Sequence, residues 1–494
     1  MPSEKRDIVA EEKLDSTSMD VESGENRHVQ GRHVKSPEEK KLFRKINIAT
    51  MPLVCLVVFV QFIDKSTINT AAVMGLYEDT HITQNQFSWL GSIFYVGYLA
   101  FQIPNNYLLQ RMPISKYLGS ILVVWGVVLG CLALSKNFAD LAGIRFLLGF
   151  FEASTYPCIF LLISILYRRS EQVIFFTTMF VCNGVATAAS GLIGYGIGNM
   201  HGLRGISAWQ WCMIIWGIVT VVLGIALFLW LPDKAKSRWF RLTPEEELIV
   251  EERTKDNAVV ANKVFKIAHI KEALKEPRFY CVCFISLFVN LQNGCLTIFS
   301  SQIIKSMGFT NLQSILLNIP NGASTILCLG FGMYLSRRFN SVCFVGAIAM
   351  FIAMVGAIVL VAIPSGPVKL LGIYIGATSP PYVMLQTCIS NNVSGYTKKI
   401  FYTSGNLVFY CIGNFVGPLM MVENEAPRYI GGMSGYVVVD FLTILLFIYI
   451  RFSLVRDNRR RELLRKEQNT PPPPENRDEL DLTDKEDLWF TYRP

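Results

Sequence analysis

The chain has 494 residues, of which 51% are hydrophobic and only 17% are charged, and its mean hydropathy is +0.36. Soluble domains carry about 25% charged residues, so this composition excludes an ordinary soluble enzyme and indicates a polytopic membrane protein. The net charge of +8 is explained by basic loops on one side of a membrane, and nucleic acid is not an expected partner.

The first 36 residues are polar and nearly free of aromatic side chains, so we predict a disordered N-terminal tail. The first apolar run starts at Ile46, too far into the chain and too long for a cleaved leader, and indicates a signal-anchor helix. Apolar windows of about 20 residues span a bilayer. The sequence predicts twelve such helices, at residues 47–68, 86–108, 117–135, 139–166, 172–197, 208–231, 278–300, 313–335, 342–363, 368–390, 400–421 and 434–455.

Basic residues are distributed unevenly between the two ends of these helices. The richer side carries Lys40, Lys41, Arg44, Lys45, Arg111, Lys116, Arg168, Arg169, Arg337, Arg338, Lys398, Lys399, Arg456, Arg459, Arg460 and Arg461. The other side carries Lys136, Arg204, Lys305, Lys369 and Arg428. Because basic loops stay in the cytoplasm, this asymmetry predicts that both termini are cytoplasmic.

A hydrophilic loop separates the sixth helix from the seventh. Its segment from Thr243 to Arg253 has a threonine cap, a proline in the first turn and several acids, which predicts a surface helix. On either side of the loop, the run that starts at Tyr107 resembles the run that starts at Tyr334, which favours two parallel repeats.

The predicted fold is an all-α membrane protein with twelve transmembrane helices in two six-helix bundles. Its parts are a tail (1–45), an N-terminal bundle (46–231), a cytoplasmic linker (232–276), a C-terminal bundle (277–456) and a cytoplasmic C-terminal tail (457–494).

The fourth predicted helix carries two charges inside an apolar run. Arg145, Gly149, Glu152 and Tyr156 fall on one helical stripe. A charged side chain at mid-bilayer costs about 2.5–3.5 kcal/mol on insertion scales, so this stripe is expected to face the bundle interior and a substrate or ion path. The alternative is an internal ion pair, or an arginine bonded to backbone carbonyls, that only locks helices together.

The first predicted helix is interrupted by polar groups at Gln61, Asp64, Lys65 and Asn69, which share one broad face. This pattern indicates a hydrated surface inside the protein. The alternative is a helix end that reaches the outer interface.

The second half supplies a further candidate surface. Asn290 and Asn293 belong to an amide cluster in the seventh helix, and the tenth holds Pro380-Pro381 followed by Tyr382 and Gln386. Consecutive prolines remove backbone hydrogen bonds, and non-helical backbone at membrane depth is tolerated only against protein or a water-filled cavity. We expect Asn290, Asn293, Tyr382 and Gln386 to contact the substrate. The alternative for the intramembrane amides is that they bridge helices by hydrogen bonds.

Motifs for cofactors and metals are absent from the sequence. The twelve cysteines lie in apolar segments without a CxxC pair, and no P-loop, GxGxxG or paired-histidine motif occurs. We therefore expect no cofactor, no metal site and no catalytic residue.

Several short motifs together resemble the major facilitator superfamily, and within it the fungal allantoate permease branch of the anion:cation symporter family. The motifs are Asp64-Lys65, the run from Arg145 to Gly149 with Glu152 and Pro157, Trp211, the run from Met307 to Thr310, the run from Asn392 to Lys398, the run from Gly413 to Pro418, and the run from Glu425 to Tyr429. The chain differs from the family in having Lys65 where arginine is usual, and in a degenerate signature around Pro104, Asn105 and Arg111.

The resemblance implies proton-coupled symport of a small organic anion, such as nicotinate, pantothenate or allantoate, by alternating access between the bundles. It also implies that the protein is not an enzyme and acts as a monomer in the plasma membrane, with the endoplasmic reticulum as the alternative. A nutrient receptor with the same fold, which signals without appreciable flux, is the rival hypothesis.

The residue chemistry suggests separate roles for the charged groups. Lys65, Arg145 and Gln61 are expected to bind the anion, while Glu152 and Asp64 are candidates for proton coupling. Burial disfavours an ionised carboxylate and a nearby cation favours it. We expect Glu152 to carry the proton, because it lies in the middle of its helix, whereas Asp64 is expected to be more hydrated near the outer end of the first helix.

Overall fold

The computed structural model describes residues 36–109, 111–167, 169–232, 234, 236–257, 266–364, 366–376, 378–467 and 481–494. The polar tail up to residue 35, Arg168 and the prolines at 471–474 therefore lie outside the described residues. The chain divides into two units, Met1–Lys45 and Ile46–Pro494. The second unit holds the candidate site and is described below.

The described part of the chain is built from helices. Those before the linker are α2 (Pro37–Val73), α3 (Leu76–Thr80), α4 (Gln84–Leu109), α5 (Ile114–Cys131), α6 (Phe138–Glu152), α7 (Thr155–Leu166), α8 (Arg169–Gly198) and α9 (Ala208–Trp230). The linker contributes α10 (Pro244–Asn257) and α11 (Ile267–Leu274). The second half contains α12 (Pro277–Ser306), α13 (Asn311–Leu316), α14 (Asn318–Phe339), α15 (Val342–Ala362), α16 (Leu370–Ile375), α17 (Ser379–Asn392), α18 (Tyr396–Leu419) and α19 (Ile430–Glu467).

Polar side chains at the helix starts explain several of these boundaries. The surface helix expected after Thr243 is α10, where Thr243 Oγ1 accepts from the backbone N–H of Glu246 at 3.3 Å. Asn137 caps α6 by accepting from the backbone N–H of Asp140 at 2.9 Å. Each cap satisfies a backbone donor that the helix itself leaves unpaired.

Three predicted membrane helices are interrupted. The eighth is divided at Leu317 into α13 and α14. The fourth is divided into α6 and α7, with Ala153 and Ser154 between them. Pro157 has no N–H to donate to the carbonyl of Ala153, one turn earlier, which explains the break directly after Glu152. The tenth is divided into α16 and α17 ahead of Pro380-Pro381, in agreement with the expected broken helix.

Nine of the helices in the described part of the chain are long and apolar enough to cross a membrane by length and composition. The predicted second, tenth and eleventh helices are not among them, and correspond to α4, α16 with α17, and α18. These helices carry more polar side chains. Two of them, α4 and α18, pack against each other between the two halves of the protein, where polar groups meet protein instead of lipid.

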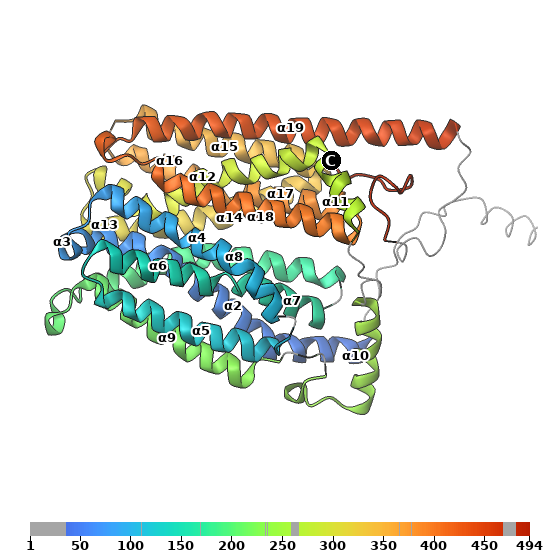
Figure 1. Ribbon diagram of the computed structural model, residues 1–494, viewed down its shortest axis with the longest axis horizontal. Helices are drawn as coiled ribbons and strands as arrows, with labels where there is room; N and C mark the ends of the chain where they lie inside the picture. The colour runs from blue at the N-terminus through green and yellow to red at the C-terminus, as the bar shows by residue number, and fades with distance from the viewer. Residues whose placement is uncertain are drawn as a thin grey trace, which may run out of the picture. The chain divides into compact units, whose positions relative to one another are not determined.

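The helix pairing repeats in order along the chain. α5 packs along α9 and α15 packs along α19, which pairs the third membrane helix with the sixth and the ninth with the twelfth. Figure 1 shows these two pairs at opposite edges of the helical array. α4 packs on α18 and α8 on α14, so the second helix meets the eleventh and the fifth meets the eighth. Equivalent pairs therefore recur when the second six helices are placed on the first six, as expected for parallel repeats.

Glycines allow the closest of these helix contacts. A Cβ on Gly149 would lie 1.9 Å from the carbonyl oxygen of Phe94, and one on Gly417 would lie 2.1 Å from that of Leu291. Backbones can approach this closely only where a side chain is missing. Gly149 thus holds α6 against α4 beside the candidate site.

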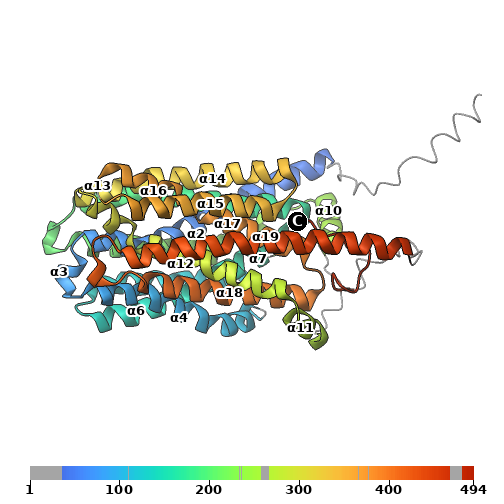
Figure 2. The ribbon, with the colours of Figure 1, turned by 90° about the horizontal axis from the view of Figure 1, so that it is seen from above.

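The two ends of the helical array differ. α10, α11 and residues 481–494 lie at one end, which we name the linker end, and α3 and α13 lie at the opposite end (Figures 1 and 2). α19 continues to Glu467 at the linker end, well beyond its predicted end at residue 455.

Candidate functional site

The centre of the N-terminal bundle holds a buried ion pair between the first and fourth membrane helices. Lys65 Nζ lies 2.9 Å from Glu152 Oε1, and Gln61 Nε2 donates to the same oxygen at 2.9 Å. The Glu152 side chain is fully buried, and the Lys65 side chain is 12% exposed. The structure therefore brings together three residues that the sequence assigns to polar stripes of two different helices.

One oxygen of the Glu152 carboxylate lacks a hydrogen-bond donor among the described residues. Glu152 Oε2 and Gln61 Oε1 accept no hydrogen bond from any residue within the described ranges. A buried acceptor without a donor is costly when charged. Glu152 Oε2 is thus a position where a proton can bind without displacing Lys65 from Oε1.

Aromatic rings surround the Lys65 ammonium. Its Nζ lies 5.8 Å from the ring centre of Phe94 and 5.7 Å from that of Tyr98, both on α4. These rings stabilise a cation through their electron-rich faces while leaving its donors available. Neither ring was identified from the sequence, because aromatic residues in an apolar helix resemble ordinary core residues.

Asp64 lies on the same helix but has a different partner. Its Oδ2 accepts from Trp125 Nε1 of α5 at 2.5 Å, and the residue is only 2% exposed. The prediction that Asp64 is the more hydrated acid is wrong, because α2 extends beyond it to Val73. Burial alone therefore does not distinguish Asp64 from Glu152.

Arg145 is held by the backbone of a neighbouring helix. Its Nε donates to the carbonyl oxygen of Leu90 at 3.3 Å, and its guanidinium carbon lies 5.0 Å from the ring centre of Phe94. Arg145 and Asp64 remain close enough for their charges to interact, and so do Arg145 and Glu152. Its hydrogen bond is the helix-bracing contact that the sequence left open as an alternative.

Three amides of the C-terminal bundle bond to one another. Asn293 Nδ2 donates to Asn414 Oδ1 at 3.0 Å, and Asn414 Nδ2 donates to Asn290 Oδ1 at 3.1 Å. These bonds join α12 to α18 and fit the helix-bridging role of intramembrane amides. Asn290 is 2% exposed, whereas Asn293 is only partly buried and is the more accessible of the two.

The broken tenth helix presents a second polar group. Tyr382 OH accepts from Gln386 Nε2 at 2.9 Å and from Asn406 Nδ2 at 3.4 Å, and both Tyr382 and Gln386 are partly exposed. Asn406 Oδ1 accepts no bond from any residue in the described part of the chain. This trio could therefore accept and donate hydrogen bonds to a polar ligand.

Tyrosines connect the two candidate surfaces. The Tyr410 ring centre of α18 lies 6.2 Å from that of Tyr95 on α4 and 5.6 Å from that of Tyr382 on α17. The charged residues of the site are all in the N-terminal bundle, while the residues that face them across the tyrosines are neutral. An anion between the bundles would find its cation only on the N-terminal side.

Most of the membrane region matches a known family of proteins. The sequence model described as Major Facilitator Superfamily matches residues 54–418. The chain belongs to the major facilitator superfamily. It is a multi-pass membrane transporter and not an enzyme, and the predicted twelve-helix fold is confirmed.

Relatives place this superfamily member among fungal permeases. The allantoate permease of Saccharomyces cerevisiae is 32% identical, over 93% of this chain and 87% of that protein. The thiamine pathway transporter THI73 of the same organism is 30% identical, over 96% of this chain and 89% of its own. A solved bacterial homologue of the human lysosomal transporter Spinster, inward-facing and occupied, has a TM-score of 0.64 at 14% identity, covering 84% and 97% of the two chains.

The two bundles of the transporter are joined by hydrogen bonds at the end of the helical array opposite the linker end. Asn69 Nδ2 donates to Ser300 Oγ at 2.8 Å, and Asn69 Oδ1 accepts from the backbone N–H of Ser301 at 2.9 Å. Farther out, Gln84 Nε2 donates to Tyr429 OH at 2.5 Å. Asn69 was predicted to lie on a hydrated face, and it instead closes this end between α2 and α12.

We expect Asn69→Ala to weaken this closure. The change leaves the N–H of Ser301 without its side-chain acceptor and removes a buried bond, which costs about 1–3 kcal/mol. Hydrogen exchange by mass spectrometry should then show roughly tenfold faster exchange in residues 298–302 and in the loop around Gln84. Thr297→Val, which removes a bond within α12 alone, should leave this exchange unchanged, and equal effects of the two variants would contradict the assignment.

Proposed function

We propose that this transporter is a proton-coupled symporter of a small organic anion and works by alternating access of a site between the bundles. The observation that carries the proposal is the buried Lys65–Glu152 pair, 2.9 Å apart and faced by neutral side chains of the C-terminal bundle. Its relatives include an allantoate permease, which supports a carboxylate or a comparable small molecule as substrate.

The ion pair suggests how the proton and the anion are coupled. A proton on Glu152 neutralises the partner of Lys65, and the freed ammonium can then bind the carboxylate of the substrate. Loss of that proton restores the pair and expels the anion. The cycle exchanges one partner of Lys65 for another, so the buried ammonium is paired with an anion both in the empty and in the loaded carrier.

Lysine at this position affects how the anion is bound. An ammonium is a compact point charge, whereas arginine offers a planar fork that matches a carboxylate with two bonds. Gln61 Nε2 is 2.9 Å from Glu152 Oε1, so an amide donor is already present beside the ammonium. Lys65 and Gln61 together would supply two donors for one carboxylate, while Arg145 would stabilise it from a greater distance.

Topology and location complete the proposal. The linker end would face the cytoplasm, with both termini, because the basic loops gather there. The bundles would end near residues 231 and 456, with the linker at 232–276. The protein would act as a monomer in the plasma membrane, and one proton per monoanion would make transport electroneutral, so that the membrane potential contributes nothing to accumulation.

The test is uptake by cells that express the protein, with labelled nicotinate, pantothenate, biotin, allantoate and cysteine at two external pH values. We expect saturable uptake of at least one acid, faster at the lower pH. Saturable binding without uptake of any compound would favour a receptor. Uptake that is independent of a proton gradient would exclude proton coupling.

We expect Tyr382→Phe and Asn293→Ala to change the selectivity among these acids. Tyr382 OH accepts two hydrogen bonds in the C-terminal bundle, and removing a hydrogen bond to one substrate typically changes its relative affinity about 5- to 10-fold. The measurement is the ratio of uptake rates for two acids at equal surface expression. Thr387→Val, which breaks only a bond within α17, is the matched control, and an equal decrease for every substrate would indicate a structural role instead.

A further inference from the structure

The last residues that the structure describes, 481–494, are packed against the linker end of the C-terminal bundle, and we name this segment the strap. The N–H of Val342 donates to the carbonyl of Pro494 at 2.8 Å, and the N–H of Arg493 donates to Asn392 Oδ1 at 2.7 Å. The N–H of Tyr396 donates to Asp481 Oδ1 at 2.6 Å. The strap thus bonds to the ends of three helices, α15, α17 and α18.

A buried ammonium joins the strap to the linker. The Lys398 side chain has no exposed surface, and its Nζ lies 2.8 Å from Glu272, 2.6 Å from Glu276 and 2.7 Å from Asp484. Glu272 belongs to α11, Glu276 precedes α12, and Asp484 belongs to the strap. One cation of α18 therefore binds two segments that are far apart in sequence, residues 272–276 and the strap.

The carboxylate of Glu276 also accepts contacts from groups other than Lys398. Lys485 Nζ lies 3.0 Å from Glu276 Oε1, and Tyr402 OH donates to Glu276 Oε2 at 2.5 Å. Burial alone would raise the pKa of Glu276, but the ammonium of Lys398 and these donors hold that pKa below its usual range. The Glu276 carboxylate therefore stays ionised at neutral pH.

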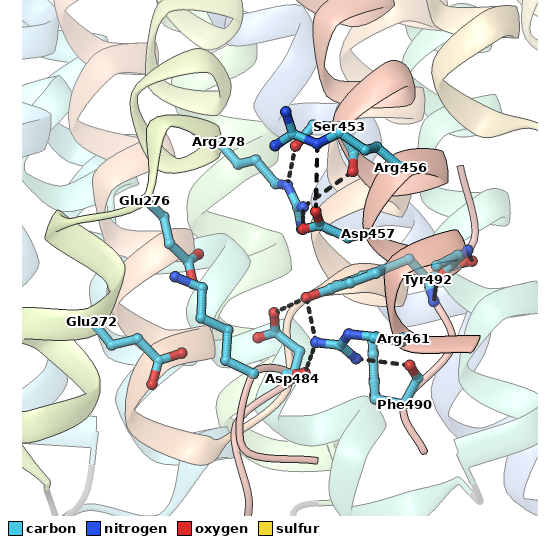
Figure 3. A network of polar contacts seen from close by, with 12 residues as sticks. Glu272, Glu276, Arg278, Ser453, Arg456, Asp457, Arg461, Asp484, Phe490 and Tyr492 are labelled. Carbon is cyan, nitrogen blue, oxygen red and sulfur yellow. Dashed lines mark hydrogen bonds and ion pairs between the residues drawn. The ribbon is translucent and has the colours of Figure 1, made fainter. Parts of the chain in front are cut away.

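An arginine of α19 recognises the backbone of the strap. Arg461 donates to the carbonyls of Asp487 at 3.2 Å and Phe490 at 2.8 Å, and also to that of Asp484. Tyr492 OH donates to Asp484 Oδ2 at 2.7 Å, and Figure 3 shows Arg461, Asp484 and Tyr492 converging from the helix and the strap. These contacts require the strap to be folded through its turns at residues 484–486 and 488–489, so the site selects its conformation.

The strap also packs against α11. Thr483 is fully buried and donates to Glu272 Oε2 at 3.2 Å. A Cβ on Gly395 would lie 3.2 Å from Thr483 Cγ2, and Gly395 has a φ of +86° that favours glycine. The site is therefore shaped to fit this threonine, and α11 is held between the strap and the start of α18.

We propose that the linker end of the C-terminal bundle is a binding site for residues 481–494, and that the bound strap fixes α11 to the bundle. The helices that meet in this site, α12 and α18, also carry the Asn293–Asn414 bond near the membrane centre. The strap thereby holds the linker ends of two site helices at a fixed separation, so that the bundle moves as one body. Release of the strap frees α11 and lowers the turnover of the transporter.

The test is hydrogen exchange by mass spectrometry on the full chain in lipid nanodiscs. Asp484→Asn removes one charged partner of Lys398, and a charge-assisted bond of this kind corresponds to about 10- to 100-fold in the docking equilibrium. We expect exchange to rise by that factor in residues 481–494 and in α11, and nowhere else. Glu462→Gln is the control, since it removes an acid of α19 that pairs with Lys466 at the surface.

A second pair of variants tests the fit of the threonine. Thr483→Asp places a carboxylate beside Glu272 and should release the strap, whereas Thr483→Ser keeps the hydroxyl and should preserve slow exchange. The proposal is overturned if the strap of the unmodified protein exchanges without protection, if Asp484→Asn matches Glu462→Gln, or if exchange rises throughout the C-terminal bundle. Because exchange requires no substrate, this result is independent of the proposed symport, and a fall in the uptake rate of Asp484→Asn with unchanged KM would add the transport consequence.

Discussion

Glu152→Gln is expected to keep substrate exchange across the membrane and to lose accumulation driven by a proton gradient. A neutral glutamine can still accept from Gln61 and Lys65 but cannot release a proton, so it mimics the protonated carrier. A gradient of one pH unit corresponds to a factor of ten, or about 1.36 kcal/mol, for one coupled proton. The accumulation ratio in proteoliposomes should therefore fall from about ten to about one.

Asp64→Asn is the matched comparison for this prediction. Asparagine can keep the bond from Trp125 Nε1, and Asp64 does not pair directly with the Lys65 ammonium in the part of the chain that the structure describes. We expect its accumulation ratio to stay near that of the unmodified protein. If accumulation survives in Glu152→Gln and disappears in Asp64→Asn, then Asp64 and not Glu152 carries the coupled proton. Loss of binding in Glu152→Gln at normal expression would make Glu152 a substrate ligand.

The fold could be predicted well because membrane helices leave a strong signal in the sequence. Apolar windows of the required length can be counted directly, and the charged stripe of Arg145 and Glu152 could face only the interior. Helical periodicity shows which face of a helix is polar, so both polar stripes could be assigned to the interior. It did not decide whether Glu152 pairs with Lys65 or with Arg145.

The partners of the other charges could not be predicted in the same way. Arg145 donates to a backbone carbonyl, and every residue offers such an acceptor. Asp64 accepts from Trp125, which in the sequence is indistinguishable from an ordinary buried aromatic residue. Asn293 and Asn414 satisfy each other, although each amide alone is as compatible with substrate as with another helix. Partner choice depends on the rotation of one helix against its neighbour, which periodicity does not contain.

The strap shows a different limit of the sequence. Its acids, from Asp481 to Asp487, resemble a solvated tail, and no periodic apolar pattern marks it as folded. Its structure comes from a buried cation, Lys398, and from Arg461, both of which the sequence alone assigns only to the loop and tail charges that set the membrane topology. Local sequence could not show that the two groups of charges meet.

Under the proposed mechanism, Lys65→Met should lower uptake by about 100-fold or more, because the substrate anion loses the ammonium that is proposed to bind it. The fold should survive, since an unpaired buried carboxylate takes up a proton instead of remaining charged, and Glu152 retains its bond from Gln61. The measurement is initial uptake at equal surface expression. Lys116→Met removes a lysine whose Nζ bonds only to the carbonyl of Phe228 among the described residues, and should have little effect.

Lys65→Arg separates the need for charge from the need for a particular shape. Arginine keeps the positive charge and offers two parallel bonds to a carboxylate, so uptake should persist, with a KM that changes more than the maximal rate. The double variant Lys65→Met/Glu152→Gln should express normally and remain inactive, because it restores neutrality without restoring an anion ligand. Uptake by this double variant would show that Lys65 serves only to neutralise Glu152, and the substrate would then have to bind Arg145.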